Sequence, residues 1–227
     1  MKKLIIYTIY LVVFSTTFLS FGQTKMEYNL NEIDLDFKPN EELIREFNDL
    51  KKSSDEIQLI LKSGKDSLVT IYVKNNINES IKTRMQDQQL IIIQEAKNKK
   101  GEWKPIEYWI DSDCGNSYES LYIKSKNIIK TETRAYNKGK FNTEIRIKFL
   151  NNNKVYYSNS IQGKIDLSQF KVNIPKYLRN VEKIIGKETN EKMLFLVPNG
   201  QKEVSEKYAK YYEEKEKKNR KNKITKQ

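Results

Sequence analysis

The chain contains no histidine among its 227 residues. This absence excludes Ser-His-Asp and Cys-His catalysis, because both use an imidazole as the general base. It also removes a common zinc ligand and the one side chain whose ordinary pKa lies close to neutral pH. The sequence therefore predicts no metal, no other cofactor and no assignable catalytic residue.

Cysteine is almost as scarce, since Cys114 is the only one in the chain. A lone cysteine cannot form an internal disulfide, so the fold must depend on its apolar core, which a domain of this size can supply. Asp111 and Asp113 lie close to Cys114 and would raise the pKa of its thiol, whereas a nucleophilic cysteine needs a lowered pKa. We expect an unused thiol, buried or free, or a mixed disulfide with a partner.

The first 22 residues are typical of a cleavable export signal. Two lysines precede an uncharged stretch, residues 4–22, and small residues stand at Ser20 and Gly22. Signal peptidases need small side chains at these two places before a cut after Gly22. The alternative is an uncleaved membrane anchor, since a span needs about 20 apolar residues. We expect cleavage, and a mature chain that begins at Gln23 and works outside the cytoplasm.

Residues 55–165 carry the alternating apolar pattern of β-strands. Ile145, Ile147 and Phe149 alternate with charged residues, which is the pattern of a half-exposed strand. Seven or eight such segments recur at intervals of about ten to fifteen residues, separated by turns such as a hairpin turn at residues 137–140. The pattern predicts a mainly β fold, an antiparallel β-sandwich-like domain.

Helical patterns flank this domain on both sides. Asn40 can cap an N-terminal amphipathic helix whose apolar residues are Leu43, Phe47 and Leu50. A second helix is expected to end at Gly186, followed by a short apolar strand at residues 193–197. The chain therefore divides into a signal peptide (1–22), an arm and helix (23–54), the sandwich-like domain (55–165), a mixed helix and strand segment (166–200) and a charged tail, helical or disordered (201–227).

The densest group of unusual residues begins at Trp103, where both tryptophans lie within a stretch that ends at Ile110. If this stretch is one strand, Trp103, Glu107, Trp109 and Asp111 share a face. An aromatic platform with acidic groups beside it suits a sugar ring or a peptide. The candidate ligand-binding residues are those four and Tyr118. The alternative is that the tryptophans pack in the core.

A carboxylate-dependent hydrolase of glycans is the alternative function. Such enzymes use two carboxyl groups at a set separation, which is a property of the fold rather than of the sequence. Glu107, Asp111 and Glu119 are the first candidates.

Residues 111–116 resemble a calcium loop only superficially. The fifth and sixth places hold Gly115 and Asn116, and the twelfth holds Tyr122, so three required positions are wrong. We expect a tight turn in which Gly115 and Asn116 adopt positive φ.

The tail is the most basic part of the chain, with ten Lys or Arg against five Glu in residues 201–227. It suggests a second alternative, a polyanion-binding envelope protein. Interspersed glutamates favour a solvated helix, and export argues against a nucleic-acid partner.

Several strings resemble small exported proteins of Bacteroidota: Trp-Lys-Pro-Ile-Glu-Tyr-Trp from Trp103, Cys-Gly-Asn-Ser-Tyr from Cys114, and the Tyr156–Ile165 segment. The resemblance covers residues 55–175 and implies no activity, cofactor or catalytic residue. The end of the chain does not resemble a β-rich sorting domain, so the periplasm is expected rather than the medium. The leading interpretation is a non-enzymatic binding or accessory module of the cell envelope, whose partner is a protein or a glycan.

Overall fold

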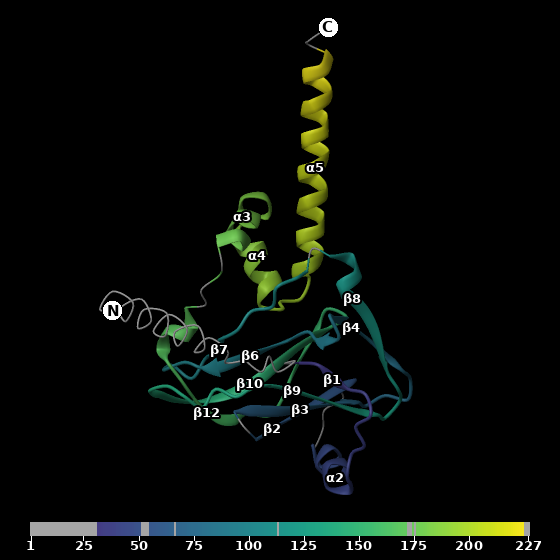
Figure 1. Ribbon diagram of the computed structural model, residues 1–227, viewed down its shortest axis with the longest axis vertical. Helices are drawn as coiled ribbons and strands as arrows, with labels where there is room; N and C mark the ends of the chain where they lie inside the picture. The colour runs from purple at the N-terminus through teal and green to yellow at the C-terminus, as the bar shows by residue number, and fades with distance from the viewer. Residues whose placement is uncertain are drawn as a thin grey trace, which may run out of the picture.

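The structure is a computed structural model that describes residues 31–50, 55–65, 67–112, 114–171, 174 and 176–224 (Figure 1). The expected signal peptide, residues 1–22, and the first part of the expected arm lie outside the described residues. No helix in these ranges combines the length and the apolar character needed to cross a membrane.

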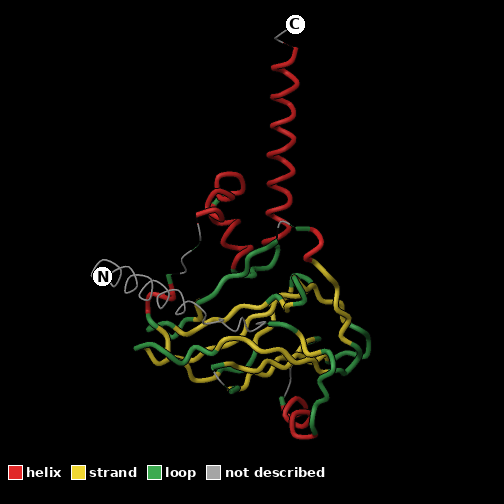
Figure 2. Tube along the Cα trace, in the orientation of Figure 1, coloured by secondary structure: helices red, strands yellow, loops and turns green. Residues whose placement is uncertain are grey.

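The described chain is mainly antiparallel β-structure, with helices gathered toward its C-terminal end (Figure 2). The strands are β1 (Ile33–Asp34), β2 (Ile57–Ser63), β3 (Leu68–Asn75), β4 (Ile81–Gln86), β5 (Gln89–Leu90), β6 (Ile92–Lys97), β7 (Trp103–Pro105), β8 (Tyr118–Ile123), β9 (Ile128–Arg134), β10 (Phe141–Asn151), β11 (Lys154–Tyr157) and β12 (Ile161–Ile165). The helices are α2 (Glu41–Asp49), α3 (Lys176–Ile185), α4 (Lys187–Leu194) and α5 (Gly200–Ile224), with 3-10 turns η1 (Gly115–Ser117) and η2 (Leu167–Phe170).

Three sheets are formed. The first has the order β1-β9-β3-β2, the second β11-β10-β6-β7 with β12 also paired to β10, and the third β5-β4-β8. A tight turn joins β2 to β3, with the Gly64 amide donating to the Leu68 carbonyl at 3.0 Å. Another turn joins β10 to β11, and its Asn152 and Asn153 adopt φ of 46° and 63°.

One apolar core joins the three sheets. Alternate residues of the strands point into it, as the period of two requires. Its fully buried members include Leu61, Ile71, Val73, Leu90, Ile123, Ile147 and Phe149. Burying each such side chain contributes about 1.5–3 kcal/mol, so this cluster is the main source of stability in a chain with no internal disulfide.

Helix α2 covers the outer face of the first sheet and lies where the sequence predicts a helix. The Asn40 side chain accepts a hydrogen bond from the Leu43 amide at 2.9 Å, which caps the helix. Leu43 and Phe47 pack on Ile60. Leu50, the third expected apolar residue, follows the helix and is 37% exposed.

The expected hairpin turn at residues 137–140 is wrong. It connects β9 of the first sheet to β10 of the second, so the flanking strands are not paired with each other. Gly139 has φ of 144°, and a Cβ there would collide with the backbone of Ile165. The segment changes sheets because β3 and β6, not neighbours in sequence, take the pairing positions beside β9 and β10.

The expected strand at residues 193–197 is also wrong. Helix α4 ends at Leu194, and Leu196 follows with φ of 50°. Leu194 and Leu196 are buried. The apolar run is explained by the packing of a helix end on the second sheet rather than by strand pairing.

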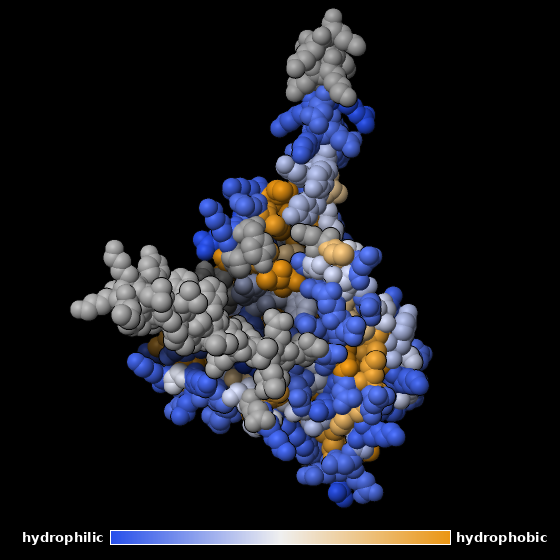
Figure 3. Space-filling view, viewed as in Figure 1, coloured by the Kyte–Doolittle hydropathy of each residue, from blue (hydrophilic) through white to orange (hydrophobic). Residues whose placement is uncertain are grey.

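Helix α5 extends to Ile224 and projects away from the sheets (Figure 1). The sequence left a helix or disorder open for residues 201–227. Ion pairs one turn apart support the helix, with Glu213–Lys217 at 2.6 Å and Glu216–Arg220 at 3.5 Å. Hydrophilic residues cover this part of the surface (Figure 3).

Candidate ligand-binding site

The predicted aromatic platform depends on one strand from Trp103 to Ile110, and this prediction is wrong. Strand β7 ends at Pro105, which has no amide hydrogen to continue the ladder. One further bond follows, from the Ile106 amide to the Gln94 carbonyl at 3.0 Å, and the chain then turns toward the C-terminal helices. The shared face is therefore not formed: Trp103 lies apart from the others, Glu107 and Trp109 line one pocket, and Asp111 lies near Tyr118.

Trp103 lies on the outer face of the second sheet. The guanidinium carbon of Arg146 is 4.3 Å from its ring centroid, and the same guanidinium is 3.7 Å from the ring of Tyr157. Arg146 also pairs with the buried Glu95 at 2.7 Å. Trp103 thus belongs to a cation–π stack on a sheet face and does not reach the other candidates.

Trp109 is a core residue, as the alternative interpretation expected. It is 8% exposed and packs with Ile91, Ile93 and Leu196. Its indole nitrogen donates to the side-chain oxygen of Gln86 at 3.1 Å. Trp109 therefore fastens the C-terminal segment to the sheets, and one edge of it also lines a pocket.

Asp111 and Tyr118 form a third environment near the base of α5. Both carboxylate oxygens of Asp111 accept from the side-chain nitrogen of Gln201 at 3.3 Å. The Tyr118 hydroxyl donates to the Ser112 carbonyl at 3.0 Å, and Arg84 stacks on its ring at 3.8 Å. Burial, with the charge of Asp111, raises the pKa of Tyr118. These contacts hold the loop before β8 and the start of α5 together.

The loop that precedes Tyr118 differs from the expected tight turn. Gly115 begins the 3-10 turn η1, and neither Gly115 nor Asn116 has positive φ. Cys114 is exposed with a free thiol. Within the described ranges, no group of three or more acidic or sulfur side chains is arranged to hold a metal ion.

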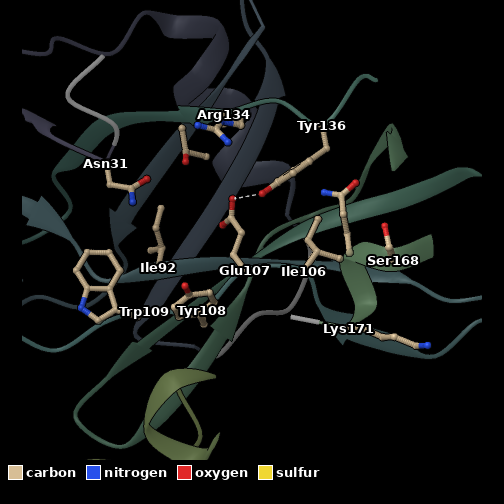
Figure 4. A pocket seen from close by; sticks show the side chains of 12 residues that line it. Asn31, Ile92, Ile106, Glu107, Tyr108, Trp109, Arg134, Tyr136, Ser168 and Lys171 are labelled. Atoms are coloured by element: carbon tan, nitrogen blue, oxygen red, sulfur yellow. Dashed lines mark hydrogen bonds between the residues drawn. The ribbon is translucent and has the colours of Figure 1, made fainter. Parts of the chain in front are cut away.

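Of the five candidates, Glu107 and Trp109 line a pocket of about 540 Å³ between the sheets and η2 (Figure 4). Its walls come from β6, β9, the segment after β7 and η2. The lining residues are Asn31, Ile92, Ile106, Glu107, Tyr108, Trp109, Thr133, Arg134, Tyr136, Ser168, Gln169 and Lys171. Apolar side chains and several polar groups therefore converge on one cavity, as is usual in small-molecule sites.

Glu107 is the best-defined polar group of this pocket. Its carboxylate accepts from the Gln94 amide at 2.9 Å, from the Gln94 side chain at 3.1 Å and from the Tyr136 hydroxyl at 2.8 Å. Figure 4 shows the Glu107 and Tyr136 side chains pointing toward one another. Burial raises the pKa of Glu107, and the hydrogen bonds and the charge of Arg134 oppose this shift.

Unused hydrogen-bonding capacity remains in the wall. The Glu107 carboxylate has about four acceptor positions and uses three, and the Tyr136 oxygen donates to Glu107 but can still accept. The side-chain oxygen of Asn31 is buried and has no hydrogen-bond partner. A ligand with several O–H or N–H donors would satisfy all three acceptors.

Sequence reasoning missed Asn31, Arg134, Tyr136 and Lys171, because they lie far from Glu107 in the chain. Tyr136 lies just before the predicted turn at residues 137–140, and Lys171 is one of 42 Lys and Arg residues. No local signal distinguishes them. They meet because the first sheet, which holds β9, and the second sheet, which holds β6, both contribute to the wall of one cavity.

The three acidic candidates for hydrolysis are not assembled. Asp111 bonds to Gln201, and Glu119 lies on β8 opposite Met85. Among the described residues that line the pocket, Glu107 is the only acidic one.

Comparisons with protein-family models, with curated proteins and with solved structures find no match to this chain. The proposals for its function therefore depend on the pocket and on the sequence.

Proposed function

We propose that this protein is an exported, non-enzymatic binding module of the cell envelope, and that it binds a sugar unit of a glycan in the Glu107 pocket. The observation that carries the proposal is the set of three acceptors with spare capacity, on Glu107, Tyr136 and Asn31, beside the apolar walls formed by Ile92 and Trp109. Sugar rings combine hydroxyl donors with apolar faces, so they suit such a cavity.

The mature chain would begin at Gln23 and fold as a sandwich-like scaffold, with the pocket between its second sheet and η2. Export is supported by the pattern of the first 22 residues. The resemblance to small exported proteins of Bacteroidota and the periplasmic location are part of the same proposal.

Binding is favoured over hydrolysis because the described part of the pocket lining holds one carboxyl group. Retaining and inverting glycosidases place a second carboxyl group about 5–9.5 Å from the first. Glu107 is also held by three hydrogen bonds from Gln94 and Tyr136, which orient it but occupy most of its acceptor capacity.

The proposal is tested with the mature protein and a panel of mono- and oligosaccharides, by calorimetry or by saturation-transfer NMR. Tyr136→Phe removes a hydroxyl that both orients Glu107 and accepts from the ligand, so we expect about a five- to thirtyfold loss of affinity. Tyr122→Phe is the matched control, because Tyr122 is 60% exposed on β8. If no sugar binds, or if both variants bind equally well, the proposal is wrong.

A further inference from the structure

The charges that line the Glu107 pocket are unbalanced. Among the described residues that line it, one side chain is acidic, Glu107, and two are cationic, Arg134 and Lys171. Both cations are exposed at the rim. Even with Glu107 ionised, these described residues carry an excess of positive charge.

Arg134 has not been neutralised by a neighbour. Its side chain makes no hydrogen bond or ion pair with any residue in the described part of the chain, although many other cations do so, such as Arg146 with Glu95 at 2.7 Å. Its charge nevertheless acts on both Glu107 and Tyr136, since it lowers the pKa of each against the larger effect of burial. Figure 4 shows Arg134 on the same side of the pocket as that pair.

Glu107, whose pKa the charge of Arg134 lowers, is a poor counter-ion for this arginine. Glu107 is not within ion-pair distance of it, and its oxygens already accept from Gln94 and Tyr136. Burial also raises the pKa of Glu107 and so opposes the ionisation of its carboxyl group. A planar guanidinium with free donors recognises a carboxylate through two parallel hydrogen bonds.

The acceptors and the cations of the pocket would bind different parts of one ligand. The acceptors on Glu107, Tyr136 and Asn31 need hydroxyl or amide donors, and Arg134 needs an anionic group, with Lys171 adding to the positive potential at the rim. We infer that the ligand is an acidic sugar, whose carboxylate binds Arg134 and whose hydroxyl groups bind the three acceptors. This inference rests on the proposed sugar-binding function and narrows it to a substrate class.

The test compares methyl β-glucuronide with methyl β-glucoside, two sugars of the same ring that differ in a carboxylate. Binding of each to the mature protein is measured by saturation-transfer NMR titration at low and at high salt. We expect the glucuronide to bind at least about tenfold more tightly, because a hydrogen bond to a charged group is worth more than one to a neutral group. Salt should reduce this preference.

Two variants locate the preference. Arg134→Gln should abolish it, so that the glucuronide binds no more tightly than the glucoside does. Arg45→Gln is the matched control, since Arg45 is an exposed arginine on α2, away from the pocket lining. Melting temperatures of both variants check that the fold is intact.

The outcomes separate the inference from the proposed function. Equal binding of the two sugars, or a preference that survives Arg134→Gln, overturns the inference and leaves sugar binding in place. Binding of neither sugar overturns both. Loss of the preference in Arg134→Gln alone supports both.

Discussion

The two tryptophans should differ sharply in what they contribute to stability. Trp109 is 8% exposed, packs on Ile91, Ile93 and Leu196, and donates from its indole nitrogen. Trp109→Ala removes this packing and leaves a cavity, so we expect a loss of about 3–5 kcal/mol in the free energy of unfolding.

Trp103 makes its main contacts with cations at the sheet surface, at 4.3 Å from Arg146 and 5.2 Å from Lys97. Exposed cation–π contacts contribute about 0.5–1 kcal/mol each, so Trp103→Ala should cost about 1–2 kcal/mol. The two tryptophans share none of these contacts, and the double variant should therefore be additive within about 0.5 kcal/mol.

Urea unfolding followed by far-ultraviolet circular dichroism measures both costs without depending on tryptophan fluorescence. With a slope of about 2 kcal/mol per molar urea, the midpoint should fall by about 2 M for Trp109→Ala and by less than about 1 M for Trp103→Ala. Trp109→Phe, which keeps part of the packing, should lie between wild type and Trp109→Ala. Equal costs for the two alanine variants, or a larger cost at Trp103, would refute this assignment of core and surface.

Three further outcomes are expected. Gly139→Ala should lower the free energy of unfolding by more than the roughly 1 kcal/mol expected of Gly101→Ala. Both glycines have positive φ, but of the two only a Cβ at residue 139 would collide with backbone atoms. Thermal unfolding of the two variants checks this. Burial raises the pKa of Glu107 above its usual 4.5, so the unfolded chain releases this proton first as pH rises. Protonated Glu107 therefore contributes to the free energy of unfolding below pH 4.5, and this contribution is lost as the pH rises through the pKa of the folded state. The stability of wild type relative to Glu107→Gln should fall between pH 4 and pH 7. A stability difference that does not change with pH contradicts this prediction. Truncation after Tyr212 should lower the helical dichroism signal but change stability by less than about 0.5 kcal/mol, since the side chains removed are exposed up to residue 220; a large drop in melting temperature would show that the distal helix packs.

Sequence patterns predicted the structure correctly where all the interacting residues lie within one helix or strand. The cap and spacing of α2 depend on Asn40, Leu43 and Phe47, which interact within three turns of one helix. Gly186, with φ of 84°, ends α3 as the sequence predicted. The strand periods also predicted a mainly antiparallel β fold, because alternation reports directly which side chains face the core.

Local patterns were insufficient at the aromatic segment. Its composition indicated a strand, but Pro105 ends the ladder and the Trp109 amide bonds instead to the Leu194 carbonyl at 2.9 Å. The same limit explains the run at residues 193–197, whose apolar residues suit a strand or a buried helix end equally well. Only the packing partner distinguishes the two.

The sequence by itself determined the helix and strand periods outside the aromatic segment and the run at residues 193–197. It also excluded imidazole chemistry and an internal disulfide, because these depend on residue type alone. Only the tertiary structure decided how the strands pair and how the sheets pack, and hence that Glu107, Arg134 and Tyr136 meet at one pocket while Trp103 and Asp111 lie elsewhere. The physical reason is that a site formed where two sheets and a loop pack together joins residues whose separation along the chain carries no information about their distance in space.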